Sequence, residues 1–153
     1  MLSALKVKNL RCFADSGRLE FGKLNILIGP NNAGKSALLS AVELLLQNSL
    51  AVHGGAPLSF AGQPQFSAFS STLRRQWGPH EQRPSQIVLD AEWGSVDDAE
   101  EALRWWTTFR LSGSESDDET FVSEADYGLL DGSKRRSNPE VSVSRRTIGR
   151  GMS

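Results

Sequence analysis

The sequence predicts an α/β fold organised around a phosphate-binding loop, and three observations lead to this prediction. Residues 24–28 are almost all apolar, which is typical of a strand buried on both faces. A glycine-rich loop follows at residues 29–36, and an apolar stretch with helical periodicity comes after the loop. Shorter segments that alternate apolar with polar residues predict an antiparallel β portion.

The composition indicates one soluble domain. The chain has 153 residues, of which 39% are hydrophobic, and this length suits one core better than two. Its single cysteine, Cys12, excludes an internal disulfide, and we expect it to be a small core thiol. No apolar run approaches the roughly 18 to 20 residues that cross a bilayer, so no membrane partner is expected and the cytoplasm is the predicted location.

Strands and a helix are predicted on the two sides of the loop. Residues 2–8 and 18–21 alternate apolar with polar side chains, as half-exposed strands do. Residues 35–48 are predicted to be a helix, because polar residues recur at spacings of four, three and four. These polar residues are Ser36, Ser40, Glu43 and Gln47. The remaining positions are apolar, so we expect the helix to be buried against the sheet with one narrow polar stripe.

Downstream of this helix the patterns are weaker. Residues 49–65 are rich in glycine, proline and serine and predict a loop. An amphipathic helix is expected next, and its apolar side chains favour core packing over a base-stacking surface. These side chains are Phe66, Phe69, Leu73 and Trp77. Residues 86–93 then predict a strand, and residues 97–106 predict another helix.

The C-terminal part is more polar. Ser-rich and charged stretches surround residues 121–127 and 141–148, which are therefore at best short strands. We predict an N-terminal lobe over residues 1–111 and, over residues 112–153, a polar and partly disordered extension or the start of a second lobe. From residue 131 onward the tail is modestly basic, and a solvated loop face is favoured over a surface that contacts phosphates.

The loop matches the spacing Gly-x-x-x-x-Gly-Lys-Ser. Its residues are Gly29, Pro30, Asn31, Asn32, Ala33, Gly34, Lys35 and Ser36. The two glycines permit backbone angles that turn N–H groups inward around phosphate oxygens, and the following helix aims its free N–H groups at the same oxygens. Lys35 supplies a positive charge for the β- and γ-phosphates, and the Ser36 hydroxyl completes a magnesium shell. The motif therefore predicts binding of ATP with Mg²⁺, whereas a glycine-rich turn without a ligand is much less favoured.

The residues around the loop also carry a family resemblance. Residues 8–13 (Lys-Asn-Leu-Arg-Cys-Phe), followed by residues 24–36, resemble the start of the ABC-type ATPase heads of SMC, RecF and OLD-family proteins. Asn32 stands where transporter-type loops usually have glycine, so the loop is more similar to the RecF and OLD group of DNA-maintenance and phage-defence ATPases. The resemblance covers about the first third of the chain. It implies an ABC/RecF-like N-terminal lobe of the P-loop NTPase type and makes Arg11 a candidate contact to the nucleotide.

A complete head of this family also has a Walker B strand that ends in Asp-Glu, where Asp supports magnesium and Glu positions the attacking water. Residues 87–90 provide an apolar run that ends in Asp90, but Ala91 follows, so a simple strand is favoured. Residues 129–131 end in Asp131, which is followed by glycine instead of glutamate. The catalytic residues are therefore not assigned, and we expect the lobe to be incomplete.

The other family motifs are also incomplete. Residues 111–115 (Leu-Ser-Gly-Ser-Glu) resemble the Leu-Ser-Gly-Gly-Gln signature, but the acidic residues that follow lack the apolar stripe of the helix that the signature opens. Gln63 and Gln65 are candidates for the Q-loop glutamine, although Gln-Pro-Gln is also ordinary linker composition. His53 and His80 lack acidic neighbours at metal spacing, so exposed histidines are favoured over ligands.

Two functions remain open from the sequence. The first is the ATP- and Mg-binding N-terminal lobe of a RecF- or OLD-like ATPase in DNA maintenance or phage defence, whose hydrolysis needs a second lobe. Its partners would be DNA and either a homodimer mate or another chain that supplies the missing elements. The second is a stand-alone nucleotide-binding or partner-binding module without turnover.

Overall fold

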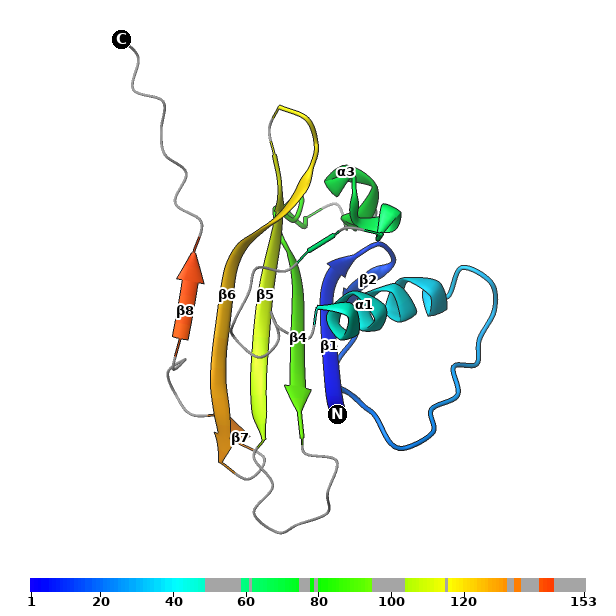
Figure 1. Cartoon of the computed structure of the whole chain (residues 1–153). Coiled ribbons are helices and arrows are strands. Elements are labelled where there is room, and N and C mark those ends of the chain that lie inside the picture. The colour runs from blue at the N-terminus through cyan, green and yellow to red at the C-terminus, as the bar shows by residue number, and fades with distance from the viewer. Residues whose placement is uncertain are drawn as a thin grey trace.

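Long antiparallel strands form the centre of the structure, and helices cover one face of the sheet (Figure 1). This computed structural model describes residues 1–48, 59–60, 62–74, 78, 80–94, 104–114, 116–131, 134–135 and 141–144. The strands are β1 (Leu2–Leu10), β2 (Phe13–Asp15), β3 (Leu19–Glu20), β4 (Ile87–Trp93), β5 (Trp105–Gly113), β6 (Thr120–Asp131), β7 (Lys134–Arg135) and β8 (Val141–Ser144). Their order is β2-β1-β4-β5-β6-β7, with β3 also paired to β1 and β8 to β6.

The inner face of the sheet holds the core. Val7, Leu89, Phe109 and Ala125 are direct cross-strand neighbours on β1, β4, β5 and β6, and all four are buried. In β4, buried and half-buried residues alternate along the whole strand, as expected where one sheet face meets the core. The antiparallel β portion that the sequence predicts is therefore confirmed, with β1 and β4 close to their expected bounds.

The helix α1 (Lys35–Gln47) packs on this inner face and is confirmed as a helix. Its buried residues lie on one side, at Ala37, Leu38, Ala41, Leu44 and Leu45. Asn48 follows the last turn, where its side chain donates to the Leu44 carbonyl and accepts from the backbone of Ser59. The expectation of burial around most of the helix is wrong, because Leu39 and Leu46 are 56% and 54% exposed. Only the side of α1 that faces the sheet has a partner layer among the described residues.

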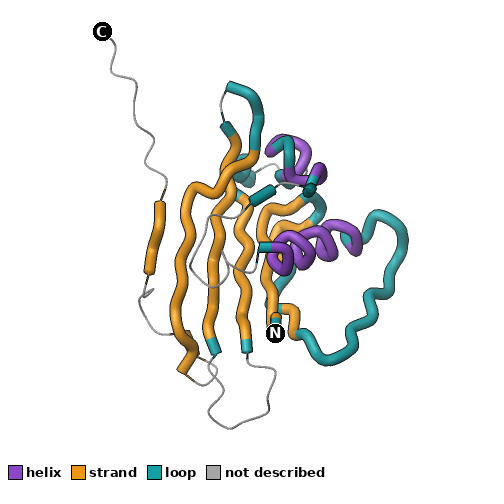
Figure 2. The backbone as a smooth tube through the Cα atoms, in the orientation of Figure 1, coloured by secondary structure: helices purple, strands orange, loops and turns teal. Residues whose placement is uncertain are grey.

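Residues 24–28 do not form the buried central strand that the sequence predicts. Figure 2 draws this stretch as loop that swings away from the sheet before it reaches α1. Leu24 is 80% exposed and Ile28 is 90% exposed. A central strand needs neighbours on both edges, and none of the described strands pairs with this segment. The apolar composition of residues 24–28 is typical of a central strand, but the described strands do not pair with this segment.

The predicted helix over residues 66–77 is much shorter in the structure. A 3₁₀ turn η1 (Pro64–Phe66) and the helix α3 (Phe69–Thr72) take its place, and Trp77 lies outside the described residues. Phe66, Phe69 and Leu73 are buried, so their assignment to the core is confirmed. The helix ends because Leu73 becomes extended and forms a bridge with Leu10, at the end of β1.

The segment predicted as a helix over residues 97–106 is also different where it is described. Trp105 and Trp106 begin β5, whereas residues 97–103 lie outside the described part. The strand β6 is longer than the expected short one, and it pairs with β5 over nearly its whole length. The strand β5 runs through residues 111 and 112 without a break. The predicted division of the chain at this point stays a prediction.

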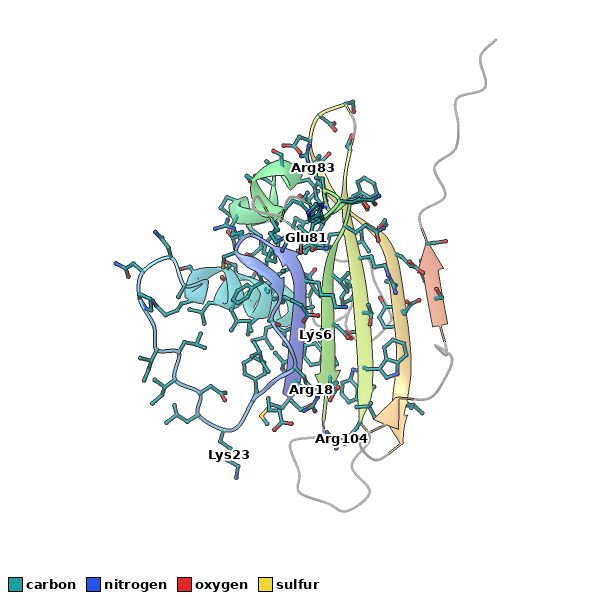
Figure 3. All side chains as sticks on the ribbon, turned by 180° about the vertical axis from the view of Figure 1, so that it is seen from behind. Lys6, Arg18, Lys23, Glu81, Arg83 and Arg104 are labelled. Carbon is teal, nitrogen blue, oxygen red and sulfur yellow. The ribbon has the colours of Figure 1, made fainter. Side chains whose placement is uncertain are left out.

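The face of the sheet opposite α1 is polar, and Figure 3 shows Lys6 and Arg18 on it. Lys6, Asp90, Thr108, Asp126 and Ser142 stand next to one another across five strands. The Thr108 hydroxyl donates to Asp90 over 2.9 Å, and the Ser142 hydroxyl donates to Asp126 over 2.7 Å. Within the described ranges, the structure contains no helix long and apolar enough to cross a membrane.

Candidate nucleotide-binding site

The glycine-rich loop reaches α1 through two residues with left-handed backbone angles. Asn32 has φ 69° and Gly34, which precedes the first helical residue, has φ 96°. Asparagine tolerates this region better than most residues, and glycine adopts it freely. The loop can therefore carry asparagine at position 32, where the transporter-type version has glycine.

The loop lies against the turn between β1 and β2. A Cβ atom added at Gly34 would lie 2.6 Å from Cys12 Sγ and 2.6 Å from the ring of Phe13. Position 34 is thus restricted to glycine by close approach as well as by its φ angle. Cys12 itself is exposed, so the expectation of a core thiol is wrong. Cys12 lies in the two-residue turn after β1, and its side chain approaches Gly34 of the loop instead of the core.

A cavity of about 490 Å³ opens between the loop and this turn. It is lined by Arg11, Cys12, Asn31, Asn32, Gly34, Lys35, Ser36 and Ala37. Its volume is in the range typical of small-ligand sites. Five residues of the predicted loop and Arg11 come together here. None of the described residues that line the cavity is Asp or Glu, so the charges in its wall are the positive charges of Arg11 and Lys35.

The first turn of α1 presents unpaired N–H groups to the cavity. No side chain caps the helix, and the first hydrogen bond runs from Leu38 N to Gly34 O over 2.9 Å. Among the residues that the structure describes, the N–H groups of Lys35, Ser36 and Ala37 have no backbone partner. These donors and the positive end of the helix dipole suit an anion.

The Lys35 side chain folds back over the loop. Its Nζ atom donates to the carbonyl oxygens of Gly29 and Pro30, each over 2.6 Å. These are contacts that a phosphate oxygen can replace, because the carbonyls are exposed to solvent and the ammonium group is mobile at the end of its stem. Hydrogen bonds of Lys35 therefore hold its ammonium group against the backbone at the start of the loop.

Arg11 forms the opposite wall and is held by the segment around α3. Its N–H group donates to Thr72 O over 2.9 Å, and its guanidinium Nη2 donates to Gln65 O over 3.3 Å. The residue has φ 49°, which is required by the tight turn between β1 and β2. The resemblance made Arg11 a candidate contact, and the structure places it in the cavity wall.

The candidates for Walker B do not lie at this site. Asp90 and Glu92 lie on the polar face of β4, where Glu92 pairs with Arg18 over 2.7 Å and Asp90 accepts from Thr108. The simple strand favoured by the sequence is therefore confirmed. Asp131 ends β6, at the far end of the sheet from the loop that precedes α1 (Figure 1).

The signature candidate is excluded by its secondary structure. Leu111 and Gly113 belong to β5, so the sequence that resembles the signature ends a strand instead of opening a helix. Gly113 also packs closely on Phe69, whose ring lies 2.5 Å from the position of an added Cβ atom. The glycine of this motif therefore has a packing role in the fold.

Gln63 and Gln65 also lie outside the cavity lining. Gln63 is 2% exposed and hydrogen-bonded to the side chains of Gln47 and Gln65. Sequence reasoning missed the burial of Gln63 and its hydrogen bonds, because Gln-Pro-Gln looked like a linker. His80 is exposed as expected, and His53 lies outside the described residues. In the described part of the chain, no group of three His, Cys, Asp or Glu side chains could hold a metal ion.

The comparison with known proteins agrees with this geometry. Residues 1–130 match the family model described as an AAA ATPase domain. The chain belongs to this family. Two relatives are similar over short stretches: an OLD nuclease of Thermus scotoductus is 48% identical over 46 residues, and an ATP/GTP phosphatase of Helicobacter pylori is 42% identical over 50 residues.

These stretches cover 30% and 33% of this chain but only 8% and 14% of the two relatives. The chain therefore matches a small fraction of the length of each relative. The family match and the relatives confirm the resemblance to the ATPase heads of the SMC, RecF and OLD-like AAA group. An α/β fold of the P-loop NTPase kind and a nucleotide-binding, ATPase-type function follow from the family.

Proposed function

We propose that this chain is the ATP- and Mg-binding N-terminal lobe of a RecF- or OLD-like ATPase with an ABC/RecF-like architecture. The observation that carries the proposal is the cavity in which Lys35, Ser36 and the unpaired N–H groups of α1 face Arg11. A role in DNA maintenance or phage defence is supported by the similarity to an OLD nuclease. DNA is accordingly the proposed binding partner.

The residues present fit a magnesium nucleotide. Gly34 has the left-handed backbone angle that leads the loop into α1, and the uncapped start of α1 offers donors for phosphate oxygens. Lys35 and Arg11 would balance the phosphate charge, and the exposed Ser36 hydroxyl would hold the metal ion. When bound, the magnesium nucleotide supplies a phosphoryl group whose charge the metal ion partly neutralises.

The site contains the binding half of an ATPase. Hydrolysis needs a carboxylate that positions the attacking water, and none lines the cavity among the described residues. Asp90 and Glu92 follow an apolar run as the acidic residues of a Walker B strand do. On the polar face of the sheet, however, Asp90 accepts from Thr108 and Glu92 pairs with Arg18. We therefore propose that the catalytic carboxylates come from a second lobe, and that the chain alone binds ATP without turnover.

An exposed apolar surface next to the loop supports the presence of a partner. It consists of Leu24, Ile26, Leu27 and Ile28 before the loop and Leu39 and Leu46 on α1. We call these six residues the apolar flank. Large apolar side chains exposed in this number are typical of proteins that bury them against a partner. We propose that a homodimer mate or another chain that supplies the second lobe covers the apolar flank.

The nucleotide-binding premise is tested by Lys35→Ala. We expect the substitution to weaken Mg-ATP binding by roughly ten- to hundred-fold, because it removes charge-assisted hydrogen bonds to phosphate. Isothermal titration calorimetry with the whole chain measures the affinity. Lys23→Ala is the matched control, since Lys23 points away from the sheet on the loop before the apolar flank (Figure 3). Equal affinities for Lys35→Ala and the unmodified chain would contradict the proposal.

A stand-alone binding module without turnover is the second candidate, favoured because no carboxylate among the described residues lines the cavity. Both candidates bind ATP, but only the first gains ATPase activity when a second lobe is added. Steady-state phosphate release by the chain, alone and mixed with a C-terminal segment of a longer OLD-like relative, separates them. Turnover that appears only in the mixture favours the ATPase lobe.

A further inference from the structure

We propose that Gln63 is a positioning residue of the nucleotide site, which holds Arg11 in the cavity wall by linking it to the last turn of α1. The inference rests on the proposed nucleotide binding and adds a determinant of affinity outside the cavity lining. Gln63 is 2% exposed, and its side-chain amide is hydrogen-bonded on both sides.

The first link connects Gln63 to α1. Its Nε2 atom donates to Gln47 Oε1 over 2.5 Å, and Gln47 in turn donates to Glu43 Oε1 over 3.0 Å. Gln47 is the last residue of α1, whose first turn borders the cavity. Gln63 is therefore attached to the end of the helix that is remote from the phosphate-binding loop.

The second link connects Gln63 to Arg11. Gln65 Nε2 donates to Gln63 Oε1, and the Gln65 carbonyl accepts from Arg11 Nη2 over 3.3 Å. Thr72 strengthens this point, since its hydroxyl donates to the same carbonyl over 2.8 Å and its own carbonyl accepts from Arg11 N over 2.9 Å. The guanidinium keeps its other N–H donors for the cavity.

The two links give Gln63 a geometric role. One wall of the cavity belongs to the first turn of α1 and the other to Arg11, and the hydrogen-bonded glutamines join the two through η1 (Pro64–Phe66). Leucine would fill the same buried volume without the desolvation cost of an amide. The amide of Gln63, unlike leucine, forms directional hydrogen bonds. These bonds fix the position of Gln65 relative to α1, and the Gln65 carbonyl in turn holds the Arg11 guanidinium.

The test is a double-mutant cycle between Gln63→Leu and Arg11→Ala, with Mg-ATP affinity measured by calorimetry. We expect Gln63→Leu to weaken binding about ten-fold in the unmodified chain, and by less than about two-fold when Arg11 is already alanine. A residue that only supports the fold would lower the affinity equally in both backgrounds. Gln86→Leu is the matched control, because the Gln86 side chain is half-buried and bonds Ser123 instead.

The possible results separate this inference from the proposed function. If Lys35→Ala abolishes binding while Gln63→Leu binds as tightly as the unmodified chain, only the positioning role fails. Equal losses in both Arg11 backgrounds overturn it as well. If the unmodified chain does not bind Mg-ATP, both proposals fall. Should Gln63→Leu not fold, Gln65→Met replaces it in the same cycle, since it removes the donor to Gln63 but keeps the backbone carbonyl that holds Arg11.

Discussion

At the scale of single residues, the site depends on how closely the turn after β1 approaches the loop. Gly34 has no side chain, and Cys12 and Phe13 occupy the space that one would need. The same contact brings Arg11 to the cavity, because Arg11 and Cys12 share one turn. The absence of a side chain at Gly34 therefore lets the turn that carries Arg11, the opposite wall of the cavity, approach the loop.

Gly34→Ala tests this contact against Gly17→Ala. Both glycines have positive φ, at 96° and 67°, but a Cβ atom at Gly17 meets nothing within 4 Å. We expect Gly17→Ala to cost about 1 to 2 kcal/mol from backbone strain alone. Gly34→Ala should cost roughly 1 to 3 kcal/mol more, because atoms of Cys12 and Phe13 must also move. Urea unfolding gives both values, and equal costs would contradict the close approach.

At the scale of elements, α1 has two apolar sides, of which the sheet covers one. Leu44 is fully buried against the core, whereas Leu46, two residues later on the same helix, is 54% exposed. Periodicity shows that both positions are apolar, but it does not show which of them has a neighbour. The exposed side of α1 carries Leu39 and Leu46, and residues 24–28 are exposed as well.

Leu44→Ala and Leu46→Ala therefore form a matched pair. We expect Leu44→Ala to lower the free energy of unfolding by about 2 to 5 kcal/mol, since it leaves a cavity between α1 and the sheet. Leu46→Ala should change it by less than about 0.5 kcal/mol in the chain alone. Denaturant unfolding measured by circular dichroism checks both. A large loss at Leu46 would show that the outer side of α1 is covered in solution.

At the scale of the whole molecule, one sheet carries the core and the candidate nucleotide site extends beyond its edge. The loop that carries residues 24–34 leaves the sheet at β3 and returns only with α1 (Figure 2). The apolar flank is consequently part of the fold's surface and not of its core. A partner that covers it would act on the site directly, because Ile28 precedes Gly29.

Substitution of the apolar flank tests its exposure. The variant Leu24→Ser with Ile26→Ser should bind less of a hydrophobic dye and self-associate less in light scattering. Its free energy of unfolding should stay within about 0.5 kcal/mol of the unmodified chain, because neither side chain is buried. Leu5→Ser is the opposite control, since Leu5 is fully buried and a hydroxyl there should unfold the chain. Unfolding of both variants would place the flank in the core.

The sequence determined the features that depend on neighbours in the chain. The motif spacing predicted the loop at residues 29–36, and helical periodicity predicted α1 almost to its ends, because both depend on contacts within a few residues. The strands β1 and β4 followed from alternation for the same reason. Arg11 was reached only through the family resemblance.

Only the tertiary structure decided which apolar segments find partners. Residues 24–28 have the composition of a central strand and remain exposed, since a strand exists only where other strands pair with it. Leu73 left a helical pattern to pair with Leu10, and Trp105 joined β5. The contact of Cys12 with Gly34 and the hydrogen bonds of Gln63 join positions that are distant in sequence. Local sequence patterns do not predict such contacts, because these contacts form only when the chain has folded.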